Sequence, residues 1–73
     1  MANKNLQLVA LIRGQFSTEA EFAEKIGWPR QKLHRMLTGG QKPSLTDVRE
    51  IAEGLDVPFM LIANIFLQME STN

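Results

Sequence analysis

Cationic side chains are concentrated in one short stretch of this 73-residue sequence, residues 28–43. The stretch WPRQKLHRMLTGGQKP carries five basic or imidazole side chains and no carboxylate, although the formal net charge of the chain is zero. These side chains are Arg30, Lys32, His34, Arg35 and Lys42. Ammonium and guanidinium groups donate charge-assisted hydrogen bonds to anionic oxygens, so a cluster of them can hold phosphate groups.

Charge is segregated along the chain rather than mixed. Between Lys25 and Thr46 there are five Lys or Arg residues and no Asp or Glu, whereas residues 47–56 hold four acids and one Arg. A nearly neutral protein can therefore present one positive face, and it is the local field that attracts phosphate.

Other kinds of chemistry find little support in the sequence. His34 is the only histidine, cysteine is absent, and no nucleophile is paired with a base, so we predict neither an enzyme nor a metal site. Gly39 and Gly40 lack the lysine and flanking pattern of a nucleotide-binding loop and are expected to end a helix instead. No small-molecule cofactor is predicted.

Length and composition predict one small folded domain over residues 1–73, because a single core fits this length and 44% of the residues are hydrophobic. The absence of cysteine fits a reducing compartment. The first apolar stretch is short and is interrupted by Gln7 and Arg13, which is typical of neither a signal peptide nor a membrane span. A cytoplasmic location, in association with the nucleoid, is the expectation.

Apolar periodicity predicts helices from end to end and no strand, so the fold class is all-α. A first helix is predicted from the shared face of Leu6, Val9, Ala10 and Arg13, and it should end near Gly14. A second helix is expected to begin at Thr18, because Thr18-Glu19-Ala20-Glu21 has the spacing of a capping box. This helix should bury Phe22, Ala23 and Ile26 and end at Gly27.

Three more helices follow in the prediction. Pro29 suits the first position of the third helix, which should bury Leu33, Met36 and Leu37 and stop at Gly39. Ser44-Leu45-Thr46-Asp47 resembles a second capping box and should begin the fourth helix. The expected inner stripe of that helix consists of Val48, Ile51, Ala52 and Leu55. The fifth helix is predicted over residues 58–68.

The connection between the second and third helices is only about three residues long. A turn this short makes the helices cross steeply, which requires a small residue at the contact and a glycine at the reversal. Ala23 and Gly27 are suitably placed, and Trp28 falls at an apolar position of the pair, where we expect a core anchor. The cationic block is then the outward face of the third helix and the loop after it.

At these residues the chain resembles the lambda-repressor-like helix-turn-helix family, which includes phage repressors, Cro-like proteins and many small bacterial regulators. The resemblance runs from about Phe16 to Leu67. Its carriers are residues 22–27 (FAEKIG), Arg30, Leu33 and Arg35, then Gly39, residues 42–44 (KPS) and residues 51–57 (IAEGLDV). The resemblance implies a compact five-helix bundle with a helix-turn-helix over residues 18–38, whose third helix lies in the DNA major groove.

The resemblance implies roles for the cationic block. The predicted base-reading residues are Arg30, Gln31, His34 and Arg35, because Arg and Gln can pair with the edges of guanine and adenine. The predicted contacts to the DNA backbone are Lys32, Thr38, Gln41 and Lys42. The chain is thus expected to bind double-stranded DNA as a small bacterial or phage regulator of the repressor, Cro-like or antitoxin type.

The sequence departs from the family pattern at three places. Glu19 stands where the family often has a glutamine that touches the DNA backbone, Pro29 replaces a common Ser or Thr, and residues 37–38 (Leu-Thr) replace a frequent Glu-Asn pair. A carboxylate near phosphate is repelled. Glu19 and the neutral total charge favour an alternative, a protein-interaction module that keeps the fold without binding DNA.

The predicted fifth helix suggests a protein partner. Nine of its twelve residues from Pro58 to Met69 are apolar, and they are distributed all around the helix. The simpler alternative is that Phe59, Ile62, Ile65 and Phe66 only complete the core. We predict instead a homodimer that binds an inverted repeat. The predicted interface residues are Phe59, Leu61, Ile62, Phe66 and Met69.

Overall fold

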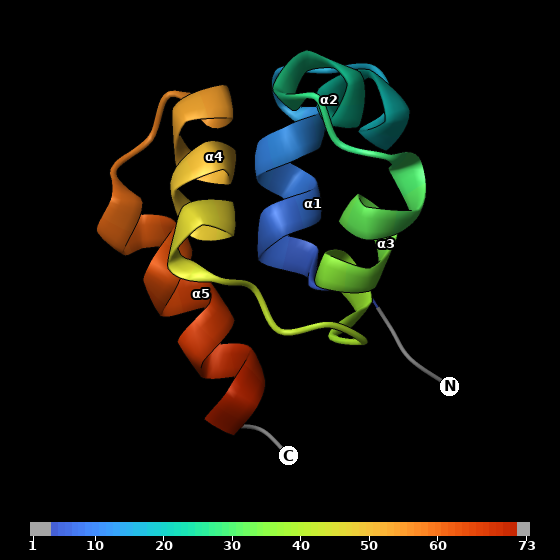
Figure 1. Cartoon of the computed structure of the whole chain (residues 1–73). Helices are drawn as coiled ribbons and strands as arrows, with labels where there is room; N and C mark the ends of the chain where they lie inside the picture. The colour runs from blue at the N-terminus through green and yellow to red at the C-terminus, as the bar shows by residue number, and fades with distance from the viewer. Residues whose placement is uncertain (1–3, 72–73) are drawn as a thin grey trace.

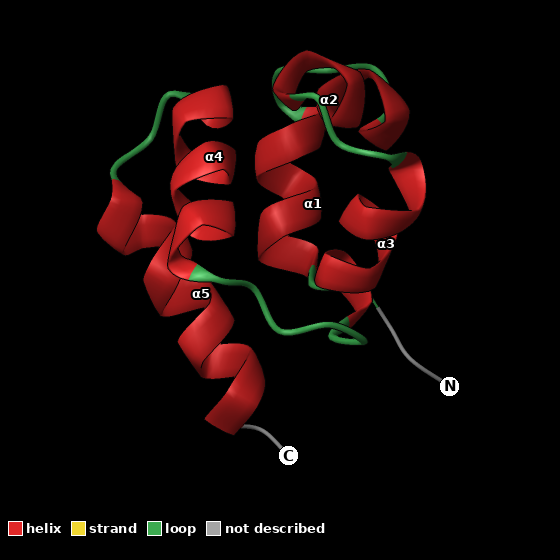
Figure 2. Cartoon of the chain, in the orientation of Figure 1, coloured by secondary structure: helices red, strands yellow, loops and turns green. Residues whose placement is uncertain are grey.

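Helices account for all the regular secondary structure in the described part of the chain (Figure 2), which confirms the all-α prediction. The computed structural model describes residues 4–71, and the side chains of residues 4–69. The helices are α1 (Leu6–Arg13), α2 (Glu19–Ile26), α3 (Arg30–Thr38), α4 (Leu45–Leu55) and α5 (Phe59–Ser71). The fifth helix therefore extends past the predicted end at residue 68.

Both predicted capping boxes are present. The Glu21 amide donates to Thr18 Oγ1 at 3.2 Å, and the Thr18 amide donates to Glu21 Oε1 at 3.3 Å. At the start of α4 the Asp47 amide donates to Ser44 Oγ at 3.1 Å, and the Ser44 amide donates to Asp47 Oδ2 at 3.0 Å. These reciprocal bonds satisfy amides that the first turn of a helix leaves unpaired, so they fix where α2 and α4 begin.

The helix ends use left-handed backbone conformations. Gly27 ends α2 at φ 77° and Gly39 ends α3 at φ 80°, as the sequence predicts, and Asp56 ends α4 at φ 58°. Pro29 differs from the prediction: its φ of −61° and ψ of 144° are extended, so it precedes α3 as the cap residue, and the helix begins at Arg30. The proline ring fixes φ near this value but leaves an extended ψ open, so Pro29 can serve as the residue that precedes the helix.

The five helices pack around one core (Figure 1). Helix α1 contacts α2 and α5, α2 also contacts α3 and α4, and α4 contacts α5. The buried apolar side chains are Leu8, Ile12, Phe22, Ala23, Trp28, Leu33, Met36, Leu37, Val48, Ile51, Ala52, Leu55, Ile62, Ile65 and Phe66. The predicted inner stripes of α3 and α4 are confirmed.

Helix α1 turns a different face inward than the sequence indicated. Leu8 and Ile12 are 1% and 0% exposed, whereas Leu6, predicted to lie on the apolar face, is 81% exposed. The amide of Asn5 donates to the carbonyl of Leu37 at 2.8 Å, which ties the start of α1 to the end of α3. This tertiary contact attaches the start of α1 to α3. Nearly every residue of α1 is apolar, so the sequence pattern alone does not decide which face turns inward.

Helices α2 and α4 approach each other closely at Gly54. A Cβ atom on this residue would lie 2.5 Å from Ile26 Cγ2 and 2.9 Å from Phe22 Cε1, both of which belong to α2. Gly54 is buried in the interior of α4, so the absence of a side chain lets the two backbones come together. The contact holds the helix pair α2–α3 against the rest of the bundle.

Candidate nucleic-acid interface

The turn between α2 and α3 sets the angle at which α3 leaves the bundle. The amide of Trp28 donates to the carbonyl of Ala23 at 2.8 Å, which closes the turn onto the last part of α2. Nothing lies within 4 Å of the position that a Cβ on Gly27 would take, so the positive φ, and not a lack of space, accounts for glycine there.

Helix α3 is anchored by its inner face. Leu33, Met36 and Leu37 are at most 2% exposed. Trp28, predicted to be a core anchor, is 7% exposed, and its indole Nε1 donates to Glu50 Oε1 of α4 at 2.8 Å. An amphipathic helix held in this way can present only its outer face to a partner.

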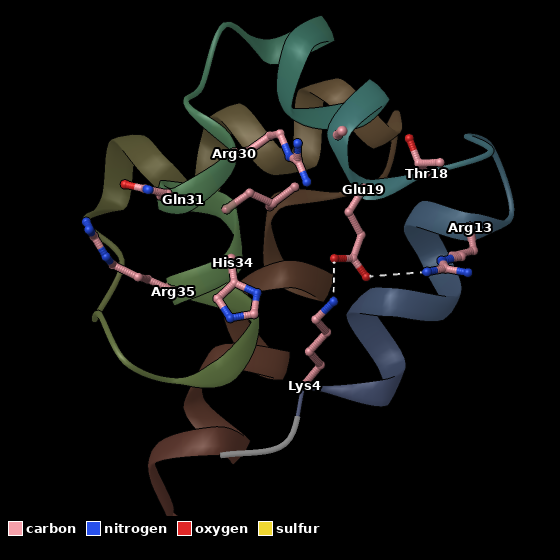
Figure 3. A pocket seen from close by; sticks show the side chains of 10 residues that line it. Lys4, Arg13, Thr18, Glu19, Arg30, Gln31, His34 and Arg35 are labelled. Carbon is pink, nitrogen blue, oxygen red and sulfur yellow. Dashed lines mark hydrogen bonds and ion pairs between the residues drawn. The ribbon is translucent and has the colours of Figure 1, made fainter. Parts of the chain in front are cut away.

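The four predicted base-reading residues lie together on that outer face. Arg30, Gln31, His34 and Arg35 are exposed, and all four line an open groove (Figure 3). The other wall of the groove comes from Lys4, Arg13 and the start of α2. The groove is thus bordered by guanidinium, ammonium, imidazole and amide groups, which can donate hydrogen bonds to base edges and to phosphates.

The four residues predicted to contact the DNA backbone differ in their contacts within the protein. Gln41 and Lys42 are exposed in the loop after α3, and the Thr38 hydroxyl donates to the Arg35 carbonyl at 3.3 Å. The Lys32 ammonium is already engaged: it lies 3.0 Å from Asp47 Oδ1 and 4.2 Å from the centre of the Trp28 ring. A phosphate contact at Lys32 stays a prediction, and the structure gives this side chain a second role in joining α3 to α4.

Asp47 is the acidic partner in this junction. Burial raises the pKa of the carboxyl group, but the Ser44 amide and hydroxyl and the Lys32 ammonium outweigh burial and hold the pKa below its ordinary value. The ionised form therefore stabilises the folded state at neutral pH. That contribution is complete above the pKa of the unfolded chain and is lost as the pH falls through the lowered pKa of the folded protein.

Replacing Asp47 by asparagine is expected to lower the free energy of unfolding by about 1 kcal/mol at about pH 7, because the capping box and the ion pair both lose the carboxylate. The difference from the unmodified protein should shrink at a second, acidic pH, as Asp47 becomes protonated in the folded protein as well. Urea unfolding followed by Trp28 fluorescence measures both values. Asp56→Asn is the matched control, since asparagine tolerates the left-handed conformation at that position. An equal loss at both pH values would contradict the assignment.

Glu19, the residue that departs from the family pattern, is not an isolated negative charge. Its Oε1 lies 2.8 Å from Lys4 Nζ, and its Oε2 lies 3.8 Å from an Arg13 guanidinium nitrogen (Figure 3). The side chain is 17% exposed. Lys4 and Arg13 were not predicted as part of the site, and the carboxylate at position 19 was interpreted as an argument against DNA binding and not as a sign of nearby cations.

Two of the predicted interface residues of α5 belong to the core. Ile62 is 0% exposed and Phe66 is 5% exposed, so neither can contact a second subunit, and these two assignments are wrong. Packing against the other helices covers Ile62, Ile65 and Phe66, as the alternative of a completed core required, but it leaves Phe59 exposed. Met69 is partly buried against the same core. Phe59 and Leu61 are exposed, as are two residues missing from the prediction, Met60 and Leu67, each at 59%.

Residues 17–63 match a protein family described as a helix-turn-helix domain. The match covers more than half of the chain and includes the whole of α2, α3 and α4. The chain therefore belongs to the helix-turn-helix domain family, in agreement with the resemblance seen in its sequence. Modules of this family bind DNA rather than catalyse reactions. No curated protein and no solved structure matches the chain.

Two further observations concern other kinds of site. Among residues 4–71 no helix is long and apolar enough to cross a membrane. Within the same part of the chain, no three His, Cys, Asp or Glu side chains are grouped so that they could hold a metal ion.

Proposed function

We propose that this protein is a sequence-specific double-stranded DNA-binding regulator. The observation that carries the proposal is the division of α3 into a buried face and an outer face with four exposed hydrogen-bonding side chains beside an open groove. Membership of the helix-turn-helix domain family supports the same function. A helix of this kind enters the major groove, where each base pair presents a distinct pattern of donors and acceptors.

The alternative of a protein-interaction module without DNA binding relied on Glu19. The ion pairs of Glu19 with Lys4 and Arg13 weaken that argument, because two cations accompany the one carboxylate. The positive charge of Arg30 and Arg35 at the groove, and of Lys42 in the loop after α3, is therefore not cancelled by Glu19. We place the protein in the cytoplasm in association with the nucleoid, where such a regulator acts.

Mutations of base-reading residues and of backbone-contacting residues should have different effects on DNA binding. Arg30→Ala is expected to reduce discrimination between a preferred duplex and a single-base variant by about 1–3 kcal/mol, because Arg30 lies in the first turn of α3 and can pair with guanine. Lys42→Ala should weaken binding to both duplexes by the same factor, because phosphate contacts carry no sequence information. Fluorescence titrations with a duplex selected from a random-sequence pool measure both effects. Equal losses on all duplexes for both variants would refute this division of roles.

We also propose that the protein acts as a homodimer on an inverted repeat, and that α5 provides the interface. Met60 and Leu67 are seven residues apart and so lie on one face of α5, and both are exposed. Phe59 and Leu61 flank this face with 37% and 41% exposure. A two-fold pair would place two α3 helices about 34 Å apart, one turn of DNA, and would join two half-site contacts into one stronger interaction.

Sedimentation equilibrium at micromolar concentration tests the dimer. The unmodified protein is expected to have the mass of a dimer, and Leu67→Glu should shift it toward the monomer, because a charge at an apolar interface is desolvated. Leu6→Glu is the control, since Leu6 is an exposed leucine on α1 and should leave the dimer intact. A well-folded monomer at these concentrations would exclude the proposed interface.

A further inference from the structure

The wall of the groove opposite α3 consists of residues that lie far from it in sequence. Lys4 precedes α1, Arg13 is the last residue of α1, and Glu19 is the first residue of α2. Figure 3 shows the Lys4 and Arg13 side chains on one side of the groove and Arg30 and His34 on the other. The groove therefore has cations on both walls and one carboxylate between them.

Lys4 is held in place by its neighbour. The Asn5 amide donates to the Leu37 carbonyl at the end of α3 at 2.8 Å, and Asn5 Oδ1 accepts from the Leu8 amide at 2.9 Å. Asn5 thus caps α1 and at the same time attaches the chain to α3. The position of Lys4 beside the groove follows from these two hydrogen bonds of Asn5, and not only from the ion pair of Lys4.

Both cations keep capacity for another anion. The Lys4 side chain is 38% exposed and the Arg13 side chain is 58% exposed, while that of Glu19 is 17% exposed. An ammonium has three N–H donors and a guanidinium has five, so neither is saturated by one carboxylate. Glu19 Oε2 is buried and accepts no hydrogen bond from the described residues, and Arg13 lies 3.8 Å from it. The carboxylate is therefore incompletely satisfied by the cations that it attracts.

We propose that Lys4 and Arg13 bind a phosphate of the DNA backbone and that Glu19 is a built-in competitor for these two cations. The inference rests on the DNA-binding function proposed above. The three side chains carry a net charge of one positive unit, so they attract a phosphate, but less strongly than the two cations would without the carboxylate. Because a phosphate contact is independent of base identity, Glu19 lowers the affinity for every duplex and leaves the preference among sequences unchanged.

The test compares Glu19→Gln with Glu24→Gln. Both changes remove one negative charge from α2, but Glu24 is exposed and lies outside the groove. Glu19→Gln is expected to bind both the selected duplex and its single-base variant about 3- to 10-fold more tightly, the effect of removing one charge near a phosphate. Glu24→Gln should change either affinity by less than about twofold. Circular dichroism verifies that each variant is folded.

A double-mutant cycle separates competition from the simple removal of charge. In the unmodified protein Lys4 must give up part of its ion pair to bind phosphate, whereas in the Glu19→Gln variant there is no ion pair to give up. Lys4→Gln should therefore weaken DNA binding by a larger factor in the Glu19→Gln background than in the native one. If Glu19 instead positioned Lys4 for DNA, Glu19→Gln would weaken binding and the inequality would be reversed.

One further variant tests the proposed phosphate contact even if Glu19→Gln does not fold. In the native background, Lys4→Gln combined with Arg13→Gln should weaken all duplexes alike and reduce the log–log salt slope by up to about 0.9 for each phosphate that is no longer neutralised. An unchanged affinity and slope would overturn the inference, as would equal affinities of Glu19→Gln and Glu24→Gln, while the proposed function would stand. A native protein that binds no duplex at low salt would overturn both.

Discussion

Affinity for duplex DNA is expected to fall by at least about a thousandfold when the salt concentration is raised from about 50 mM to about 200 mM. The groove and the loop after α3 supply five cations in one chain: Lys4, Arg13, Arg30, Arg35 and Lys42. A dimer in which each subunit neutralises about three phosphates reaches the six contacts for which losses of this size are typical. Each neutralised phosphate releases condensed counterions from the DNA, and added salt opposes that release.

Fluorescence titrations at four or more salt concentrations measure the slope, which should be roughly −0.9 for each neutralised phosphate. Lys42→Ala should reduce the magnitude of the slope, whereas Gln31→Ala, which removes no charge, should not. Binding that is indifferent to salt would favour the protein-interaction module over the DNA-binding regulator.

Replacing Gly54 by valine is expected to destabilise the domain by about 3 kcal/mol, which is a large part of the stability of a domain this small. The new Cβ would lie 2.5 Å from Ile26 Cγ2 and 2.9 Å from Phe22 Cε1. Phe22 is fully buried, and the branched side chain of Ile26 holds its Cγ2 methyl close to the backbone, so neither can move aside easily. Helices α2 and α4 would have to separate.

Urea unfolding of Gly54→Val and Gly40→Val measures this effect. A Cβ on Gly40 would lie 3.6 Å from Thr38 Oγ1, an ordinary contact, and Gly40 is exposed, so its replacement should cost no more than about 0.5 kcal/mol. Gly54→Val should also weaken DNA binding at temperatures where it is partly unfolded. Similar stabilities of the two variants would show that α2 and α4 can repack.

Local sequence signals predicted the parts of the fold that local interactions determine. The capping boxes of Thr18 and Ser44 and the glycine stops at Gly27 and Gly39 involve residues at most a few positions apart, and all four are confirmed. The inward face of α1 was not predictable in the same way. Both Leu6 and Leu8 are apolar, and the choice between them depends on packing against helices that are remote in sequence, to which the contact of Asn5 with α3 belongs.

In the candidate site, too, the sequence predicted what local patterns determine and missed the contacts between remote residues. The outward face of α3 could be predicted, because the buried residues Leu33 and Met36 leave only one orientation for Arg30. The pairing of Lys4 with Glu19 could not, since fifteen positions separate them and no periodic pattern joins them. On α5 nearly every position is apolar, so composition alone did not distinguish the core residue Ile62 from the exposed Met60.

The contacts between α3 and α4 also affect how much of the protein must become ordered when it binds DNA. Trp28 is bonded to Glu50, and Lys32 lies between the Trp28 ring and Asp47, so both the turn before α3 and its first turn are attached to α4. The backbone of α3 is therefore already helical before the protein binds DNA. Binding then restricts mainly the rotamers of the exposed side chains, and the entropy of ordering the helix is already lost during folding.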